Sequence, residues 1–306
     1  MMSSRLLILC WHNVSGTWSF PSPAGAGQRG LERQLRVLSR WANVLPLDVA
    51  LRRLADGGRL PPRAVALTFD DGYRDNLTLA VPMLKALQLP ATFFLVPGLL
   101  SNTALPWWEQ ASWAIKASRC DHLDWQDQRL PLLSDNQRQA AVDQVQRDLK
   151  GVPRAERDSE TERLLELLLP RGPGPTAEGL FLDWDEARQL IHQGFDIGSH
   201  TCQHTILSRE TDASQVQELV DSRRLLENRC EVSADLLAYP NGTAEDYDAA
   251  TLLAAASAGH QWALTTREGF NGRHTAPLEL RRVVMYPERG VVELLATLRY
   301  AFRSVK

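Results

Sequence analysis

Short apolar runs alternate along the chain with stretches in which apolar residues recur every three or four positions. The runs are apolar at nearly every position, which is typical of strands that are covered on both faces, as in a parallel sheet. Amphipathic helices fit between most of the runs, and this alternation predicts an α/β fold built on a parallel sheet. The predicted strands span residues 6–10, 64–69, 92–96, 195–197, 236–239, 262–264 and 282–285.

The helices predicted between these strands have recognisable ends. One begins at Asp183, with Glu186 three residues later in a capping-box arrangement, and ends at Gly194. The others are expected at about 31–41, 77–88, 212–229 and 245–258.

The region from about 101 to 180 interrupts this alternation of strand and helix patterns. It starts with Pro106-Trp107-Trp108, becomes rich in Gln, Arg and Asp, and ends in a Pro/Gly cluster at 170–175. It has few apolar positions with which to build a core of its own. We therefore expect a helical insertion within one barrel domain that spans residues 1–306.

Composition narrows the class of protein. The chain has 306 residues, 44% of them hydrophobic and 23% charged, with a formal net charge of −3, which predicts a globular fold. It lacks a block of Lys and Arg, so neither nucleic acid nor an anionic membrane surface is an expected partner. The apolar stretch 6–11 is shorter than the roughly 7–15 residues of a signal-peptide core, and no window approaches the roughly 18 apolar residues of a membrane span. Four cysteines without paired spacing also fit a reducing compartment, so a cytoplasmic protein is expected.

Two carboxylates stand at the end of a predicted strand, in ALTFDDGYRDN (66–76). In barrels of parallel strands, the carboxyl ends of the strands form the active face. Asp70 and Asp71 are adjacent and point in different directions, so one can bind a metal while the other handles protons. Alternatively, both aspartates cap the following helix.

Two histidines follow another predicted strand, in GSHTCQHTILS (198–208). On a helical turn, the i,i+4 spacing of His200 and His204 puts the imidazoles about 5–6 Å apart at Cβ. Two histidines and one carboxylate supply the three protein ligands of a catalytic zinc site and leave a position open for water.

These motifs resemble those of a known family. TFDDGY followed by SHTxxH is similar to the polysaccharide deacetylases of carbohydrate esterase family 4, the NodB-homology group, and AYPNG (238–242) partly resembles the third motif of that family. The resemblance covers nearly the whole chain. It implies a distorted (β/α)7-type barrel, a carbohydrate partner, and metal-dependent hydrolysis of N-acetyl groups on an N-acetylhexosamine polysaccharide or its precursor.

The resemblance also assigns roles to individual residues. It implies that Asp71, His200 and His204 hold a divalent metal ion and that Asp70 is the general base. It implies that the Tyr73 backbone N–H contributes to the oxyanion hole. Zinc is the default ion, while cobalt, iron or nickel also suit these ligands. From the third motif, Tyr239, Pro240 and Asn241 are expected to contact substrate.

The chain departs from the family pattern at several positions. Ala238 stands where the third motif has Arg, and no late histidine occupies a convincing position for the catalytic acid. CWHNV (10–14) resembles the YHxV opening of the branch that includes exopolysaccharide deacetylases, so we expect His12 to protonate the leaving amine, the alternative being a structural histidine. Arg281 and Arg282 point to opposite sides of a strand, so only one of them can reach the barrel mouth. Arg282 is the expected replacement for the missing arginine, the alternative being Arg281.

Nine tryptophans are many for this length. Trp107 and Trp108 are expected to line a sugar-binding groove, because aromatic faces pack on sugar rings.

Two other functions remain open at this point. One is a non-catalytic carbohydrate-binding module whose site has decayed. The other is a hydrolase of O-acetyl esters or small cyclic amides on the same fold.

Overall fold

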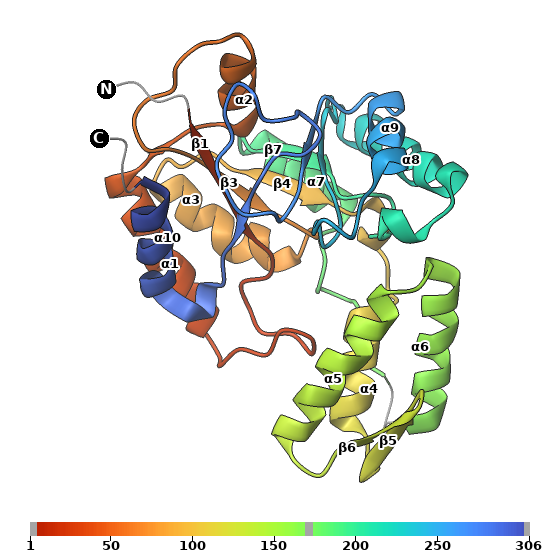
Figure 1. Ribbon diagram of the computed structural model, residues 1–306. Helices are drawn as coiled ribbons and strands as arrows, with labels where there is room; N and C mark the ends of the chain where they lie inside the picture. The colour runs from red at the N-terminus through yellow and green to blue at the C-terminus, as the bar shows by residue number, and fades with distance from the viewer. Residues whose placement is uncertain (1–4, 169–173, 303–306) are drawn as a thin grey trace. The chain divides into compact units, whose positions relative to one another are not determined.

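The computed structural model describes residues 5–168 and 174–302 (Figure 1). The described chain separates into two units, each with its own internal contacts. We call the described part of 1–15, 22–101 and 179–306 the barrel unit, and the described part of 16–21 and 102–178 the insertion unit.

A curled parallel sheet is the framework of the barrel unit. Its strands are β1 (Leu6–Trp11), β2 (Asn43–Val44), β3 (Ala64–Phe69), β4 (Thr92–Leu95), β7 (Asp196–Ser199), β8 (Leu236–Ala238), β9 (Trp262–Leu264) and β10 (Val283–Val284). They follow the order β10-β1-β3-β4-β7-β8-β9, and β2 pairs with β3. Leu280, just before β10, forms a parallel bridge with Leu264 of β9. The bridge brings the two edge strands of the sheet, β9 and β10, close to each other. The predicted α/β barrel architecture is confirmed as a half-barrel, and every predicted strand is found within a few residues of its expected bounds.

Side chains of β1 and β3 alternate between two buried clusters. Leu7 and Leu9 belong to the cluster beneath α1 (Ala26–Trp41) and α10 (Gly290–Phe302). Leu6 and Ile8 belong to the opposite cluster, which includes α2 (Leu47–Ala55). Both faces of the sheet are therefore covered, which explains why the strands read as continuous apolar runs.

The remaining elements of the barrel unit connect these strands. They are η1 (Asn76–Ala80), α3 (Val81–Ala86), η2 (Pro97–Leu99), α7 (Trp184–His192), η3 (Leu207–Arg209), α8 (Asp212–Cys230), α9 (Ala249–Ser257) and η4 (Pro287–Arg289). The capping box predicted at Asp183 and Glu186 is present at the start of α7. The predicted helix 77–88 divides into π-helical η1 and α3, with Pro82 in the first turn of α3, because proline lacks the N–H that a continuous helix requires. Two helices, α2 and α10, are absent from the predicted set, although Leu47, Ala50, Leu51 and Leu54 recur at helical spacing.

The insertion unit has a core of its own. It contains α4 (Trp107–Ala117), the antiparallel hairpin β5 (His122–Trp125) and β6 (Gln128–Pro131), α5 (Asp135–Lys150) and α6 (Arg154–Leu168). Trp125, Val145 and Leu164 are among its fully buried side chains. The composition of this region suggested too few apolar residues for a core, but Val142, Val145 and Leu149 recur at helical spacing and are buried along one side of α5. Among the residues that the structure describes, no helix is both long enough and apolar enough to cross a membrane.

Candidate active site

Asp70 and Asp71 follow β3 and are both buried, with exposed fractions of 1% and 4%. Asp71 and Gly72 have φ values of 73° and 77°, so the chain turns sharply in the left-handed region immediately after the strand. Neither aspartate caps the next helix, because that position belongs to Asp75. The alternative of a helix-capping role for the pair is therefore excluded.

His200 and His204 lie in the loop after β7, and this loop is not helical. Thr201 and His204 have φ values of 60° and 55°, and the Thr201 hydroxyl accepts a hydrogen bond from the Thr205 amide at 3.0 Å. The two imidazole centroids are 4.9 Å apart. The prediction that a helical turn brings them together is wrong. Two left-handed residues in a tight loop produce the same proximity.

Asp71 and the two histidines converge on one point. Asp71 Oδ1 lies 3.3 Å from Nε2 of His200 and 3.3 Å from Nε2 of His204, and it is a buried oxygen without a hydrogen-bond partner in the described structure. His200 Nδ1 lies 2.7 Å from the Ala238 carbonyl oxygen and donates to it, so Nε2 carries the lone pair. An orphaned carboxylate oxygen facing imidazole nitrogens is the donor set of a divalent metal ion, and these three residues fit one.

The charges of the site favour a cation. Burial raises the pKa of Asp71, but the close approach of the His200 and His204 imidazoles outweighs it and holds that pKa well below its usual value. Burial lowers the pKa of His200, but the neighbouring Asp70 and Asp71 outweigh burial and raise it. The two carboxylates therefore attract positive charge to this point of the site.

Arg282 reaches the second carboxylate. Its side chain is fully buried, with Nη1 2.8 Å from Asp70 Oδ1 and Nε donating to the Thr265 carbonyl oxygen at 3.1 Å. Arg281 is exposed. Burial raises the pKa of Asp70, but Arg282 and His200 outweigh burial and lower it, so the carboxylate stays ionised. Asp70 Oδ2 lies 4.0 Å from His200 Nε2, while its Oδ1 is paired with Arg282.

Comparison with known proteins identifies the family. The sequence model described as polysaccharide deacetylase matches residues 57–263, which is more than half of the chain. The chain belongs to the polysaccharide deacetylase family. It is therefore a carbohydrate deacetylase, a class of hydrolases.

Individual relatives agree with this deacetylase assignment. YxkH of Bacillus subtilis (strain 168) is 22% identical over 286 residues, which cover 93% of this chain and 72% of YxkH. The poly-beta-1,6-N-acetyl-D-glucosamine N-deacetylase of Escherichia coli (strain K12) is 36% identical over 87 residues, 28% of this chain and 13% of that protein. The structure of IcaB from Ammonifex degensii has the same fold, with a TM-score of 0.62, 18% identity, and coverage of 97% of this chain and 98% of IcaB.

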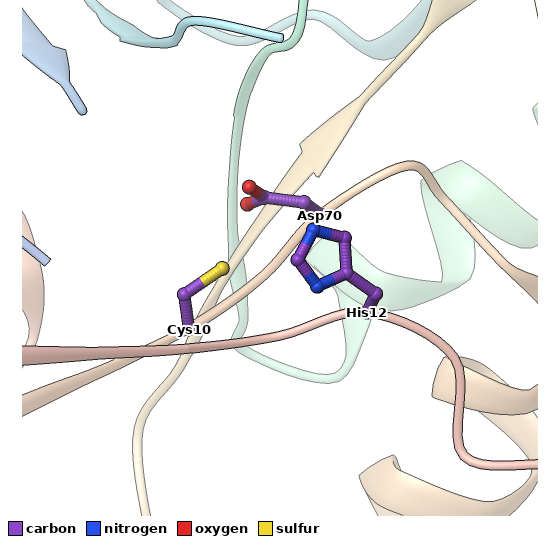
Figure 2. Close-up of side chains that lie close together, drawn as sticks. All are labelled: Cys10, His12 and Asp70. Carbon is purple, nitrogen blue, oxygen red and sulfur yellow. The ribbon is translucent and has the colours of Figure 1, made fainter. Parts of the chain in front are cut away.

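His12 lies next to Asp70. It follows β1, is partly buried, and has a ring nitrogen within 4.8 Å of ligand atoms of Cys10 and Asp70. Figure 2 shows the His12 ring beside the Asp70 carboxylate. His260 instead lies buried, with Nδ1 donating to the Ala234 carbonyl oxygen at 3.0 Å, so of these two histidines only His12 reaches the site.

Other predicted site residues divide into turn and core positions. The Tyr73 ring is buried against Phe181, with centroids 4.8 Å apart, which anchors the backbone just after the Asp71–Gly72 turn. Asn241 is partly exposed in a left-handed turn after β8 (φ 56°), while Pro240 is buried.

Three aromatic side chains predicted to contact substrate are buried in cores. The Tyr239 ring stacks on Tyr247 and its hydroxyl donates to the Leu278 carbonyl oxygen at 3.1 Å, so the side chain belongs to the barrel core. Trp107 and Trp108 belong to the insertion unit, with exposed fractions of 9% and 6% and their rings packed edge to face. Arg157 lies over the Trp107 ring at 5.2 Å. This burial gives no support to the expectation that these side chains line a sugar-binding groove.

Sequence reasoning overlooked two contributors to the site. Cys10 lies beside Asp70, and the Ala238 carbonyl oxygen orients His200. The alternation of side chains along β1 could have indicated Cys10, since positions 10 and 12 face the same side of a strand. No pattern in the sequence marks a backbone carbonyl.

Proposed function

We propose that this deacetylase removes N-acetyl groups from an N-acetylhexosamine polymer by metal-dependent hydrolysis. The observation that carries the proposal is the convergence of Asp71, His200 and His204 beside an Asp70 carboxylate that is paired with Arg282. The local similarity to the E. coli deacetylase of poly-β-1,6-N-acetylglucosamine supports this class of polymer.

Asp71, His200 and His204 would hold the divalent ion, with zinc as the default and cobalt, iron or nickel as alternatives. When bound, such an ion would lower the pKa of a coordinated water towards ~7 and polarise the acetyl carbonyl. The Ala238 carbonyl oxygen keeps the His200 ring in the orientation that turns Nε2 towards Asp71.

Asp70 would be the general base that takes the proton of the attacking water. Arg282 keeps the carboxylate ionised and fixes Oδ1, which leaves Oδ2 on the side of His200. The Arg282 guanidinium is itself held by the Thr265 carbonyl oxygen, so the base sits in a fixed position before substrate arrives.

The remaining groups would serve the later steps. The Tyr73 backbone N–H would stabilise the oxyanion, a contribution worth ~10²–10³ in rate where one such donor has been removed. His12, beside Asp70, would protonate the departing sugar amine. Asn241, in the exposed turn after β8, would contact the sugar.

The direct test measures acetate and new primary amines released from poly-β-1,6-N-acetylglucosamine oligomers by zinc- or cobalt-loaded protein. Wild type should release both products in equal amounts. Asp70→Asn should lower the rate ~10²–10⁴-fold, the range for loss of a general base, while retaining stoichiometric metal. Asp196→Asn, an exposed aspartate at the start of β7, is the matched control and should behave as wild type.

Two results would count against the proposal. Metal-loaded wild type that releases no acetate from any N-acetylhexosamine oligomer would exclude deacetylation of this class of polymer. Release of acetate from O-acetylated xylan alone would indicate an esterase. A protein that purifies without stoichiometric metal and cannot be loaded would instead match a decayed site.

A further inference from the structure

A second group of ligand atoms includes Asp70. Cys10, His12 and Asp70 each present one ligand atom, and these atoms all lie within 4.8 Å of one another. Figure 2 shows the thiol, the imidazole and the carboxylate turned towards a common space. None of these three residues is among the ligands that we assign to the first metal.

The fold itself produces this juxtaposition. Cys10 and His12 are two residues apart at the end of β1, so their side chains leave the same face. Cys10 pairs in register with Thr68 of β3, and the Asp70 amide donates to the Trp11 carbonyl oxygen at 2.9 Å. Asp70, two residues beyond Thr68, therefore lies beside His12 on that face.

The chemistry of the three groups is that of a site for a soft or borderline cation. A thiolate, an imidazole and a carboxylate are ligands that Zn²⁺, Co²⁺ and Cd²⁺ accept together, whereas Mg²⁺ and Ca²⁺ prefer oxygen alone. Cys10 is fully buried, and the burial removes competing water from its sulfur.

We propose that Cys10, His12 and Asp70 form a second, inhibitory site for a thiophilic divalent cation. An ion bound there engages the Asp70 carboxylate and removes the base from hydrolysis. The inhibition rests on the proposed function, whereas the binding does not.

Two features make this site weaker than the first. Burial raises the pKa of the Cys10 thiol well above its usual value, and Arg282 offsets only part of that rise. The thiol is therefore protonated before binding, and binding forms the sulfur–metal bond while the thiol proton passes to the buffer. Arg282 and a cation at the first site also repel the second cation. The second site should consequently fill only when metal exceeds one equivalent.

Cobalt titration of the metal-free protein tests the binding. The first equivalent should give ligand-field absorption without a sulfur charge-transfer band, because Asp71, His200 and His204 contain no sulfur. Further Co²⁺ should add a thiolate-to-cobalt band in the near ultraviolet, together with release of one proton. Cys10→Ser should abolish this band and preserve the first-equivalent spectrum.

Two other cysteines serve as matched controls. Cys202→Ser and Cys230→Ser replace buried cysteines outside the cluster and should retain the band. A band that persists in Cys10→Ser, or that disappears in Cys202→Ser, would overturn the assignment. So would the absence of any sulfur band in folded wild type at excess cobalt.

The inhibitory role needs a separate measurement. Excess Zn²⁺ should inhibit acetate release by wild type, and the inhibitory concentration should rise at least ~10-fold in Cys10→Ser, each protein being normalised to its own rate at one equivalent. Equal zinc sensitivity of the two proteins would overturn the inhibitory role. If no substrate is hydrolysed, the proposed function fails, while the cobalt spectra still decide whether the site exists.

Discussion

Each unit of the chain buries carboxylates, but the two environments differ in their partners. In the barrel unit, Asp70 lies against a buried arginine and Asp71 against two imidazoles. In the insertion unit, Glu109 accepts hydrogen bonds from the Thr17 hydroxyl at 2.8 Å and the Ser19 amide at 3.2 Å, both of which are neutral.

The pKa values follow this difference. Burial raises the pKa of all three carboxylic acids, but the cationic partners in the barrel unit outweigh burial and lower those of Asp70 and Asp71. The neutral donors around Glu109 do not outweigh burial, and its pKa remains raised. Burial alone therefore does not identify an active carboxylate. Neighbours that lower the pKa of a buried carboxyl below its usual value do.

The largest expected effect concerns the ion pair itself. Arg282→Gln removes the guanidinium that pairs with the buried Asp70, and loss of one member of a buried pair destabilises proteins by ~3–5 kcal/mol. Urea unfolding should show this loss. Arg281→Gln, at the neighbouring exposed position, should stay within ~0.5 kcal/mol of wild type. Equal stability of the two variants would mean that the ion pair between Arg282 and Asp70 does not stabilise the fold.

The next effect distinguishes a ligand from a structural carboxylate. Asp71→Asn should lower metal affinity more than ~100-fold, because it removes a charged ligand. Loss of a residue that only hydrogen-bonds to a ligand typically costs ~10–100-fold. Glu109→Gln should keep wild-type affinity. Competition with a chromophoric chelator measures both, and unchanged affinity in Asp71→Asn would remove Asp71 from the ligand set.

A smaller effect compares helix caps in the two units. Asp183 and Glu186 cap α7 reciprocally, with the Glu186 amide 2.7 Å from Asp183 Oδ1, whereas the Gln137 amide is 3.4 Å from Ser134 Oγ at the start of α5. Asp183→Ala should cost ~1 kcal/mol and Ser134→Ala less. Hydrogen exchange of the first-turn amides reports each helix separately, and the reverse ranking would contradict the comparison.

The smallest effect is a pH dependence. Because the pKa of Glu109 is raised in the folded state, folded protein retains a proton that unfolded protein has lost. Wild-type stability should thus fall as the pH rises from about 4.3, the ordinary value for Glu, through the raised value. The Gln side chain in Glu109→Gln does not titrate. The unfolding free energy of wild type minus that of the variant should therefore decrease over this pH range and stay constant above it. Parallel stability curves across that range would show that Glu109 titrates normally.

Much of the fold could be read from the sequence because its signals are local. Continuous apolar runs gave the strands of the parallel sheet, and the capping box fixed the start of α7. The insertion was located because the alternation of strands and helices stops there. Its core was not foreseen, although Val142, Val145 and Leu149 recur at helical spacing, because the high share of polar residues in the region concealed that pattern. The predicted helix 77–88 consists of η1 and α3, with Pro82 in the first turn of α3. This effect of proline is local and can be read from the sequence.

By itself, the sequence determined the residue types and the strand ends that carry them: two carboxylates after β3, two histidines after β7, and a histidine after β1. Only the tertiary structure decided their directions and partners. The left-handed turns at Asp71 and His204, the contact of Arg282 with Asp70, and the approach of Cys10 to that same carboxylate depend on the curl and register of the sheet. Such contacts join residues as many as 212 positions apart, and no local pattern encodes a distance across a sheet.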